Sequence, residues 1–342
     1  MKTLITGGNG FVGSALAQKL AEQGEDVRIT IRQQSNTSTI DGLDVEKVYA
    51  DVRDEQAVAN ALKGCRKLYH TAALYKVWLP DEQELHDVNV EGTRIVMKEA
   101  LRQEVEKVVL TSSIAALGIT ANGEPSDEQV RFNLWYTRLP YEISKYESEK
   151  VAEEFAQQGL PLVIVRPSLV LGEKDFYPTP SGQLVLDVLH GRYLFYLDGG
   201  INLADINDVI AGHCAAMDKG KSGESYNLGN NQNNKSLKEL FSLIGEISGV
   251  SAPRVKIPYS VALAYANLSL LMANYITHKP PLFAPGALQV LHLFKKMDST
   301  KAIGELGLPQ TPLRETIGRT IAWYSENGYW NKKKEKGPVD DS

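Results

Sequence analysis

Short apolar runs and amphipathic segments alternate along the first half of the chain. The first run, residues 2–6, is Lys-Thr-Leu-Ile-Thr and is typical of a buried parallel strand. The next segment, residues 14–23, places Leu16, Ala17 and Leu20 on one side, which predicts an amphipathic helix. The alternation continues with strands expected at 26–32, 45–50, 67–71, 105–113 and 160–166, and helices expected at 55–62, 83–100 and 141–157.

Strands and helices that alternate at this spacing predict an α/β fold with a doubly wound parallel sheet, the Rossmann arrangement. In such a sheet the ligand lies beyond the carboxyl ends of the strands, where the strand order reverses. After Pro167 the rhythm changes, because residues 172–180 are rich in Pro, Gly and charge and are expected to form a loop. Beyond it we expect mixed elements, with a strand end and helix at 204–217, a helix at 235–248 and a short strand at 254–257.

A chain of 342 residues is long for a single hydrophobic core, so we expect two lobes. The first is a dinucleotide-binding Rossmann domain at residues 1–172, to which residues 200–222 return. The second is a smaller mixed α/β substrate lobe at residues 173–199 and 223–330. Residues 331–342, which are rich in lysine, are expected to form a flexible tail.

One apolar stretch, residues 257–276, has nearly the length of a membrane-spanning helix. It is interrupted by polar side chains at Ser260, Asn267, Ser269 and Asn274. We therefore expect no membrane span and interpret the stretch as a partly buried helix. Contact with a membrane surface or a partner is the alternative.

The overall composition is that of a soluble globular protein, with 43% hydrophobic and 23% charged residues. The net charge of −5 gives no electrostatic footprint for binding nucleic acid. Cys65 and Cys214 are far apart and the six histidines stand singly, so neither a disulfide framework nor a metal site is expected. With no signal peptide ahead of the first strand, these features predict a cytoplasmic protein in a reducing compartment.

Three glycines, Gly7, Gly10 and Gly13, follow the first strand at three-residue spacing and lead into the first helix. In this pattern glycine allows a tight turn, lets the backbone approach a pyrophosphate and lets helix and strand pack closely. The pyrophosphate then lies at a helix N-terminus, where free N–H groups and the helix dipole favour an anion. An ordinary βα turn is the alternative, but the strand-turn-helix context favours dinucleotide binding.

Tyr141 and Lys145 stand four residues apart on one face of an expected helix, and Ser113 ends the expected strand before it. A tyrosine phenol has a pKa of about 10, and a nearby lysine ammonium is expected to lower it. A serine hydroxyl can hold a carbonyl or alkoxide oxygen. A solvated helix face would explain the Tyr–Lys spacing alone, but its place downstream of the glycine turn and the serine-ended strand favours catalysis.

Together these features resemble the extended short-chain dehydrogenases/reductases, also called the NAD-dependent epimerase/dehydratase family. Within the family the chain looks most like the dihydroflavonol-4-reductase group and the hopanoid-associated sugar epimerases. The resembling segments run in the family's order and cover residues 1–230. They are Thr6-Gly-Gly-Asn-Gly-Phe-Val-Gly13, Asp51-Val52, His70-Thr-Ala-Ala73, Asn89-Val-Glu-Gly-Thr93, Thr111-Ser-Ser113, Tyr141-x-x-x-Lys145 and Arg166-Pro-Ser168.

The resemblance implies a catalytic set of Ser113, Tyr141 and Lys145, in which Tyr141 exchanges the substrate's proton and Lys145 also holds the nicotinamide ribose. Asn89 is implied to order the site, with a cap or turn role as an equal alternative. The resemblance also implies a set of cofactor-binding positions along the carboxyl ends of the strands. They are Gly7, Gly10, Phe11, Val12, Gly13, Arg32, Asp51, Val52, Ala72, Ala73, Tyr141, Lys145, Pro167 and Ser168.

Two positions depart from the common pattern. Arg32, 19 residues after Gly13, stands where the fingerprint has an acid that binds the ribose 2′-hydroxyl. An arginine there can form charge-assisted hydrogen bonds with a 2′-phosphate, so we favour NADP(H), with NAD(H) possible. A solvated strand-end arginine is the alternative. Leu169 stands where many nucleotide-sugar members carry an asparagine, three residues after Arg166, which argues against a nucleotide-sugar substrate.

Several aromatic side chains occur near the expected pocket, where they could line it or pack loops onto the second lobe. They are Tyr75, Trp78, Phe132, Trp135, Tyr136, Phe176 and Tyr177. In the family, the helices expected here at 83–100 and 141–157 usually pair across a two-fold axis. A homodimer is therefore expected, with Val88, Val96 and Val151 available for its contact.

Three functions compete at this stage. The first is an NADPH-dependent reductase of a ketone or aldehyde with an apolar body. The second is an epimerase that oxidises and re-reduces a sugar with a retained NAD. The third is a non-enzymatic dinucleotide-binding sensor, which the intact Ser113, Tyr141 and Lys145 argue against. Fold alone does not decide between the first two.

Overall fold

The alternating half of the chain builds one large parallel sheet in the computed structural model, which describes residues 2–75, 82–277 and 285–331. Over these residues the sheet has seven strands in the order β10-β6-β5-β4-β1-β2-β3, and every pairing is parallel. The strands are β1 (Lys2–Thr6), β2 (Asp26–Ile31), β3 (Glu46–Tyr49), β4 (Cys65–His70), β5 (Lys107–Thr111), β6 (Leu162–Pro167) and β10 (Ser225–Leu228). This confirms the predicted doubly wound α/β fold. The strand order reverses between β1 and β4, so a ligand crevice is expected at their carboxyl ends.

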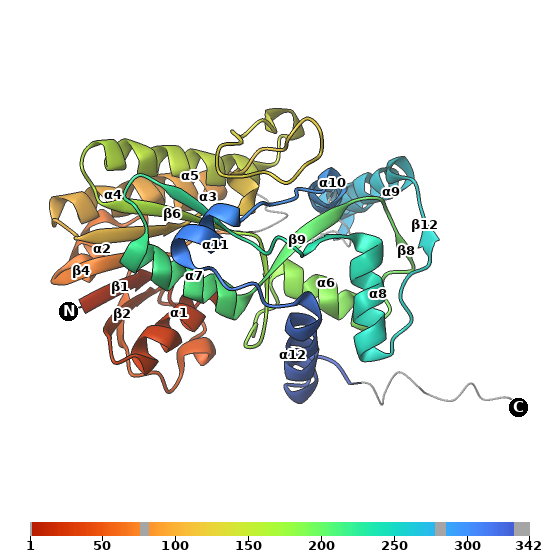
Figure 1. Ribbon diagram of the computed structural model, residues 1–342, viewed down its shortest axis with the longest axis horizontal. Helices are drawn as coiled ribbons and strands as arrows, with labels where there is room; N and C mark the ends of the chain where they lie inside the picture. Colours follow the sequence, from red (N-terminus) through yellow and green to blue (C-terminus); the bar gives the residue numbers. More distant parts are fainter. Residues whose placement is uncertain (1, 76–81, 278–284, 332–342) are drawn as a thin grey trace, which may run out of the picture.

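Helices cover both faces of this sheet (Figure 1). One face carries α2 (Glu55–Leu62), α4 (Gly92–Arg102) and α5 (Pro140–Gln157), and the other carries α1 (Phe11–Glu22), α7 (Ile206–Lys219) and α11 (Thr300–Leu306). Three short 3-10 turns lie in the connecting segments: η1 (Ser38–Ile40) between β2 and β3, and η3 (Ile114–Ala116) and η4 (Trp135–Thr137) between β5 and α5. The helix expected at 83–100 consists of α3 (Gln83–His86), a π turn (Asp87–Glu91) and α4.

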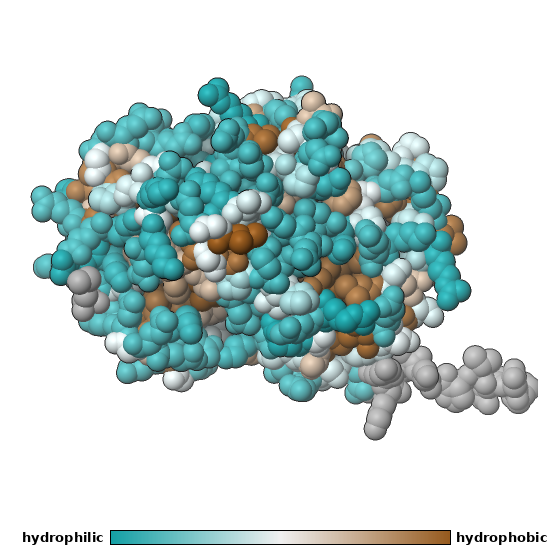
Figure 2. All heavy atoms as spheres, in the orientation of Figure 1, coloured by the Kyte–Doolittle hydropathy of each residue, from teal (hydrophilic) through white to brown (hydrophobic). Residues whose placement is uncertain are grey.

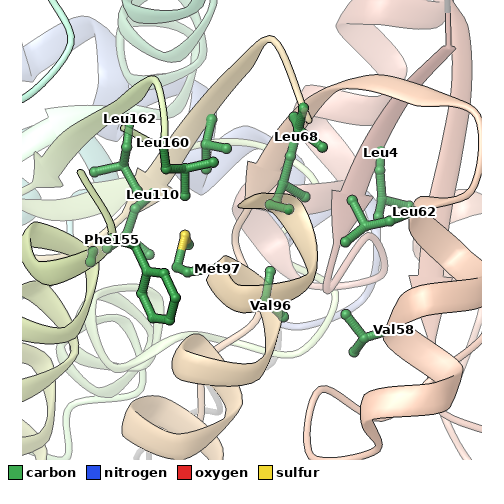
Figure 3. Packing of buried hydrophobic residues seen from close by; sticks show 14 of the residues in the cluster. Leu4, Val58, Leu62, Leu68, Val96, Met97, Leu110, Phe155, Leu160 and Leu162 are labelled. Atoms are coloured by element: carbon green, nitrogen blue, oxygen red, sulfur yellow. The ribbon is translucent and has the colours of Figure 1, made fainter. Parts of the chain in front are cut away.

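The core beneath α2, α4 and α5 consists of aliphatic side chains from both layers. Figure 3 shows Val58 and Leu62 of α2 on the side of Leu4, and Met97 of α4 beneath Leu110 of β5. These five side chains are at most 3% exposed. The apolar runs of the strands therefore pack against the apolar sides of the helices, which gives the sheet a rigid frame for the strand ends.

The chain enters the smaller lobe after β6, and this lobe lies on the right in Figure 1. In its described part, β11 (Asn234–Ser236), β9 (Gly200–Asp205) and β7 (Leu169–Leu171) form one sheet, and β12 (Val255–Lys256) pairs with β8 (Phe195–Tyr196). Its helices are α6 (Pro180–Leu189), α8 (Leu237–Ser248), α9 (Tyr259–Met272) with a π turn (Ala273–Thr277), α10 (Pro285–Leu293) and α12 (Leu313–Glu326). A third hydrophobic cluster joins these elements.

Two segments belong to a different sheet from the one that the sequence predicted. Residues 225–228, expected in the smaller lobe, form β10 at the edge of the large sheet, where Tyr226 and Leu228 are fully buried. Residues 200–205, expected to return to the first lobe, form β9 of the smaller sheet, and α7 after them packs on the large one. The physical reason is local sequence, because β10 is Ser-Tyr-Asn-Leu between two glycines and polar residues and lacks the apolar run by which the other strands are predicted.

The stretch expected as a partly buried helix forms α9 and its π turn. Ala262 and Ala266 face the third cluster, whereas its larger apolar side chains are mostly exposed. Among the described residues, none of the helices has both the length and the apolar content needed to cross a membrane. The face drawn in Figure 2 is mostly hydrophilic, with small separate apolar areas. Trp78 and most of the expected tail lie outside the described residues.

Candidate active site

The turn between β1 and α1 is shaped to hold an anion. Gly7 has a φ of +69°, and a Cβ added there would lie 2.8 Å from the Ala72 Cα. The Gly10 N–H donates to the Gly7 carbonyl at 3.0 Å. Helix α1 starts at Phe11 without a side-chain cap or an acid in its first turn, and Phe11 and Val12 pack on the cluster beneath it. The first N–H groups of α1 have no intrahelical acceptor, so they can bind a pyrophosphate.

Close packing of α1 on the ends of β1 and β4 fixes this turn. A Cβ at Gly13 would clash with the Gly7 carbonyl oxygen and would lie 2.8 Å from the Thr71 Oγ1. The Thr71 hydroxyl donates to the Thr6 carbonyl at 2.6 Å. Ala72 and Ala73 follow and are partly exposed beside the turn. The third glycine is therefore required by packing, as the dinucleotide fingerprint demands.

Residues from β2 and β3 lie together at the next strand ends. Arg32 directly follows β2 and is exposed, while Val52 is buried in the core. The Arg53 guanidinium donates to both Asp51 carboxylate oxygens, at 2.9 and 2.7 Å. These bonds, and to a lesser extent the charge of Arg32, lower the pKa of Asp51 although burial opposes them. Arg32 and Asp51 thus follow neighbouring strands of the sheet.

The three expected catalytic residues converge at the carboxyl ends of β5 and β6. Ser113 caps the turn η3, accepting the Ala115 N–H at 3.1 Å. Tyr141 lies in the first turn of α5, and its side chain hydrogen-bonds with Ser113. Lys145, one turn later, is buried, and its Nζ donates to the Thr111 carbonyl at 2.9 Å.

Burial controls the charge of this set. It raises the pKa of Tyr141 to about 12, against the opposing effect of the hydrogen bond with Ser113. It lowers the pKa of Lys145 to about 8, against the opposing charge of Glu149. The expected lowering of the Tyr141 pKa by Lys145 is therefore wrong for this structure. The reason is that desolvation of the phenolate outweighs the charge effects, and the Lys145 ammonium points to a backbone carbonyl.

A buried histidine contacts the hydroxyl of Thr111, the residue whose carbonyl accepts from Lys145. The Nε2 atom of His213 on α7 lies 2.9 Å from Thr111 Oγ1, and its Nδ1 lies 2.7 Å from the Val209 carbonyl. Burial lowers the pKa of His213 to about 4, so the ring is neutral near pH 7. Its Nδ1–H therefore donates to Val209 and its Nε2 accepts from Thr111. An isolated histidine carries no spacing signal, so sequence reasoning missed it.

Asn89 links the loop after β4 to the catalytic helix. It lies in the π turn, and its side chain pairs with the Leu74 N–H at 2.7 Å and the Leu74 carbonyl at 2.9 Å. It also donates to Ser144 Oγ at 3.0 Å, and Ser144 donates to the Tyr141 carbonyl at 2.8 Å. These contacts favour the site-ordering role over a cap.

Unpartnered hydroxyls lie at the ends of β5 and β6. Pro167 ends β6, and the Ser168 N–H after it donates to the Leu228 carbonyl at 3.2 Å. The Ser112 and Ser168 hydroxyls are buried without a hydrogen-bond partner among the described residues. Buried hydroxyls need an acceptor or donor, so these positions fit a polar ligand at this edge. Together with the glycine turn they fit a dinucleotide.

The aromatic residues divide between packing and exposure. Phe132 stacks on Tyr146 of α5 with ring centroids 5.0 Å apart and meets Trp135 edge-on. Phe176 packs edge-on against Trp323 of α12. Phe132 and Phe176 therefore pack loops onto helices. Side chains that are about half-exposed or more remain available to a substrate: Tyr75, Trp135, Tyr136 and Tyr177.

Residues 3–229 match the NAD dependent epimerase/dehydratase family. The chain belongs to this family. It is 36% identical to "Sterol demethylase protein B" of Methylococcus capsulatus, over 96% of this chain and 99% of that protein. It is 34% identical to "Putative dihydroflavonol 4-reductase" of a Synechocystis strain, over 95% of each chain. Among solved structures, a nucleoside-diphosphate-sugar epimerase from Pseudomonas aeruginosa is 26% identical with a TM-score of 0.80, over 97% of this chain and 99% of that one.

As a member of this family, the protein is an enzyme of the extended short-chain dehydrogenase/reductase type and depends on a nicotinamide dinucleotide. This family assignment agrees with the resemblance that the sequence motifs carry. It leaves the choice of reaction, cofactor phosphate and substrate to the chemistry of this chain's own residues.

Proposed function

We propose that this enzyme is an NADP(H)-dependent reductase of a ketone or aldehyde with an apolar body. The observation that carries the proposal is the contact of Ser113 with the Tyr141 phenol, whose pKa desolvation raises to about 12, so that the phenol stays protonated near neutral pH. A neutral phenol is a proton donor, which is the role that reduction of a carbonyl requires. The names of two relatives refer to a sterol and a dihydroflavonol, both of which are built on fused carbon-rich rings.

In this mechanism the cofactor and the substrate oxygen are held by different groups. When bound, NADPH supplies a hydride to the carbonyl carbon. The first N–H groups of α1 would hold the pyrophosphate, and the Lys145 ammonium, which contacts the Thr111 carbonyl, would hold the ribose hydroxyls. The Ser113 hydroxyl holds the carbonyl oxygen, and Tyr141 donates the proton that completes the alcohol.

The preference for NADP(H) rests on Arg32. Its exposed side chain follows β2, and its charge acts on Asp51 at the neighbouring strand end. A 2′-phosphate bound there would meet a guanidinium, which forms charge-assisted hydrogen bonds with phosphate oxygens. A ribose 2′-hydroxyl would lack the carboxylate acceptor that NAD-selective members place after β2.

A sugar epimerase with a retained NAD is the second candidate, because a solved epimerase shares this fold over nearly the whole chain. Leu169 opposes a nucleotide-sugar substrate, since this partly buried leucine replaces a polar amide. The deciding experiment follows NADPH absorbance with a panel of aromatic and alicyclic ketones and aldehydes. A parallel assay measures nucleotide-sugar epimerisation without added cofactor. Epimer formation with no net loss of NADPH would overturn the reductase.

The proposed homodimer uses the outer faces of α4 and α5. Val96 and Val151, expected at its contact, are 0% and 3% exposed and belong to the core, so they cannot form it. This expectation was wrong because a period-3.6 apolar stripe marks the core-facing side of a helix. The outer side carries ion pairs such as Arg94–Glu154 at 3.2 Å. A dimer here would therefore have a polar contact.

A further inference from the structure

The segment that follows α10 leaves the smaller lobe and packs against the loop after β5. Ser126 and Met297 form a parallel backbone bridge, supported by two hydrogen bonds of 3.0 Å. Met297 is fully buried in a small cluster with Ile114 and Leu117. Backbone pairing and packing therefore fix Lys295, two residues before the bridge, against the first lobe.

The Lys295 side chain is buried, and its ammonium contacts the first lobe. Its Nζ lies 3.1 Å from Glu142 Oε1 and donates to the Ala115 carbonyl at 3.0 Å. The Phe132 ring lies 5.9 Å from the ammonium. Lys295 and Glu142 are 5% and 2% exposed, and Glu142 Oε2 has no hydrogen-bond partner among the described residues. This is an ion pair with almost no access to water.

Both partners of Lys295 adjoin catalytic residues. Glu142 follows Tyr141 in the first turn of α5, and Ala115 donates its N–H to Ser113 Oγ. One ammonium thus joins the turn that carries the serine to the helix that carries the tyrosine. We propose that Lys295 is a positioning residue that sets the separation of Ser113 and Tyr141 through these two contacts. The inference rests on the proposed function of the same site.

Stability alone does not explain this arrangement. Removing two charges from water costs free energy that a buried ion pair recovers only in part, and an apolar pair of similar volume is often as stable. Apolar contacts are not directional. An ammonium that donates to two fixed acceptors, in contrast, holds two segments in one relative geometry. Geometry matters here, because a misplacement of about 1 Å can reduce turnover about 100-fold.

The test compares Lys295→Met with the double variant Glu142→Gln/Lys295→Met in the full chain. The single variant leaves a buried carboxylate without its partner, so its Tm should fall. The double variant has no such charge, so its Tm should recover. In both variants kcat should fall about 100-fold while the Kd for NADPH stays unchanged. Lys295→Arg keeps the charge and should retain more of kcat than Lys295→Met.

The control is Arg319→Met, which breaks the ion pair with Asp205 in the smaller lobe. It should lower Tm and leave kcat unchanged. A kcat of the double variant that recovers together with its Tm would overturn the proposal, because activity would then only follow stability. If Lys295→Met does not fold, the double variant and Lys295→Arg decide the question by the same comparison.

Hydrogen exchange of the amides at 113–117 and 141–144 gives a readout independent of turnover. Faster exchange in both segments of the double variant, at unchanged exchange in the large sheet, supports the positioning role. Unchanged exchange in both segments overturns it. If the unmodified chain reduces no carbonyl in the substrate panel, the proposed function fails, and the exchange measurement still decides the role of Lys295.

Discussion

Tyr141 illustrates how burial and hydrogen bonding oppose each other at a single residue. Removal from water favours the neutral phenol and raises its pKa to about 12, whereas the Ser113 contact favours the phenolate. The balance keeps the proton on Tyr141 near neutral pH. Lys145, with its pKa lowered to about 8, keeps its charge only below mildly alkaline pH. In the proposed function, the Tyr141 phenol would be the group that donates the proton.

The first residue-scale prediction removes that proton. Tyr141→Phe should lower kcat by about 10²–10⁴-fold, which is the usual contribution of general acid catalysis. NADPH binding should remain nearly intact because the ring still packs. Lys145→Met is the comparison, and it should lower both kcat and NADPH affinity. Steady-state kinetics and fluorescence titration measure these effects, and full activity of Tyr141→Phe on a confirmed substrate would refute the assignment.

The second residue-scale prediction concerns the cofactor phosphate. Arg32→Asp should weaken NADPH binding by about tenfold or more, since it replaces a charge-assisted contact with like-charge repulsion. NADH binding should change little or improve, because the new carboxylate can accept from the ribose 2′-hydroxyl. Calorimetric titration of both dinucleotides tests this. Tighter binding of NADH than NADPH by the unmodified protein would contradict the preference.

At the scale of elements, the site is held by junctions in which a helix meets a strand end. The turn between β1 and α1 depends on glycines that leave no room for side chains. The end of β5 is supported from the other face of the sheet by α7, through His213. The π turn before α4 carries Asn89, which connects the loop after β4 with α5. Each junction converts backbone geometry into the position of one functional group.

The glycine junction gives a matched pair of variants. Gly13→Ala should lower Tm and weaken NADPH binding, because the added methyl meets the backbone of the turn and the Thr71 hydroxyl. Gly304→Ala in α11 meets nothing within 4 Å and should raise stability by about 0.5–1 kcal/mol. Thermal unfolding with and without NADPH measures both. Equal effects of the two substitutions would show that packing does not select Gly13.

The α7 junction predicts a pH dependence. Because the pKa of folded His213, about 4, lies below the usual value, the unfolded chain takes up the proton first as pH falls. The free energy of unfolding should therefore decrease by roughly 3 kcal/mol from this group between about pH 6.5 and pH 4. Buried His70, with its pKa lowered to about 3, acts in the same direction.

His213→Gln should reduce that acid sensitivity, since a neutral amide takes up no proton in this range. His86→Gln is the control, because His86 is partly exposed on α3. Urea unfolding at about pH 7 and about pH 5 gives the comparison. An unchanged difference between the two pH values in His213→Gln would contradict the assignment of this histidine as buried and neutral.

At the scale of the whole molecule, the two lobes are joined by several chain crossings. The chain enters the smaller lobe after β6, returns as α7 and β10, and returns again as the segment at residues 295–298 with α11 (Figure 1). Each return brings side chains from the second half of the chain to the strand ends of the first half. The site is therefore a property of both lobes.

The proposed assembly is tested at this scale. A dimer through α4 and α5 would be held by polar contacts, so it should weaken with increasing salt. Light scattering at micromolar concentration should give twice the mass of the chain at low salt. Arg94→Glu, which reverses the charge of an outer ion pair, should lower the dimer fraction without lowering Tm. A monomer mass under all conditions would refute the dimer.

Local pattern determined the elements and much of the site. Short apolar runs predicted the first six strands of the large sheet within a few residues, because a strand buried on both faces is apolar along its whole length. It also brought Ser113, Tyr141 and the glycine turn to one edge, since parallel strands end on the same side. β7 and β10 escaped prediction, because β7 directly follows Pro167 and Ser168 and β10 mixes polar and apolar residues between glycines.

Only the tertiary structure decided which contacts surround these residues. Lys295 reaches the Ala115 carbonyl across 180 residues of sequence, and no spacing rule connects them. The pKa of Tyr141 depended on burial, which its neighbours in sequence do not reveal. Val96 and Val151 appeared available for a partner until packing placed them in the core. Sequence determines what each segment forms, whereas burial and long-range contacts determine what its side chains can do, because both depend on the whole packed chain.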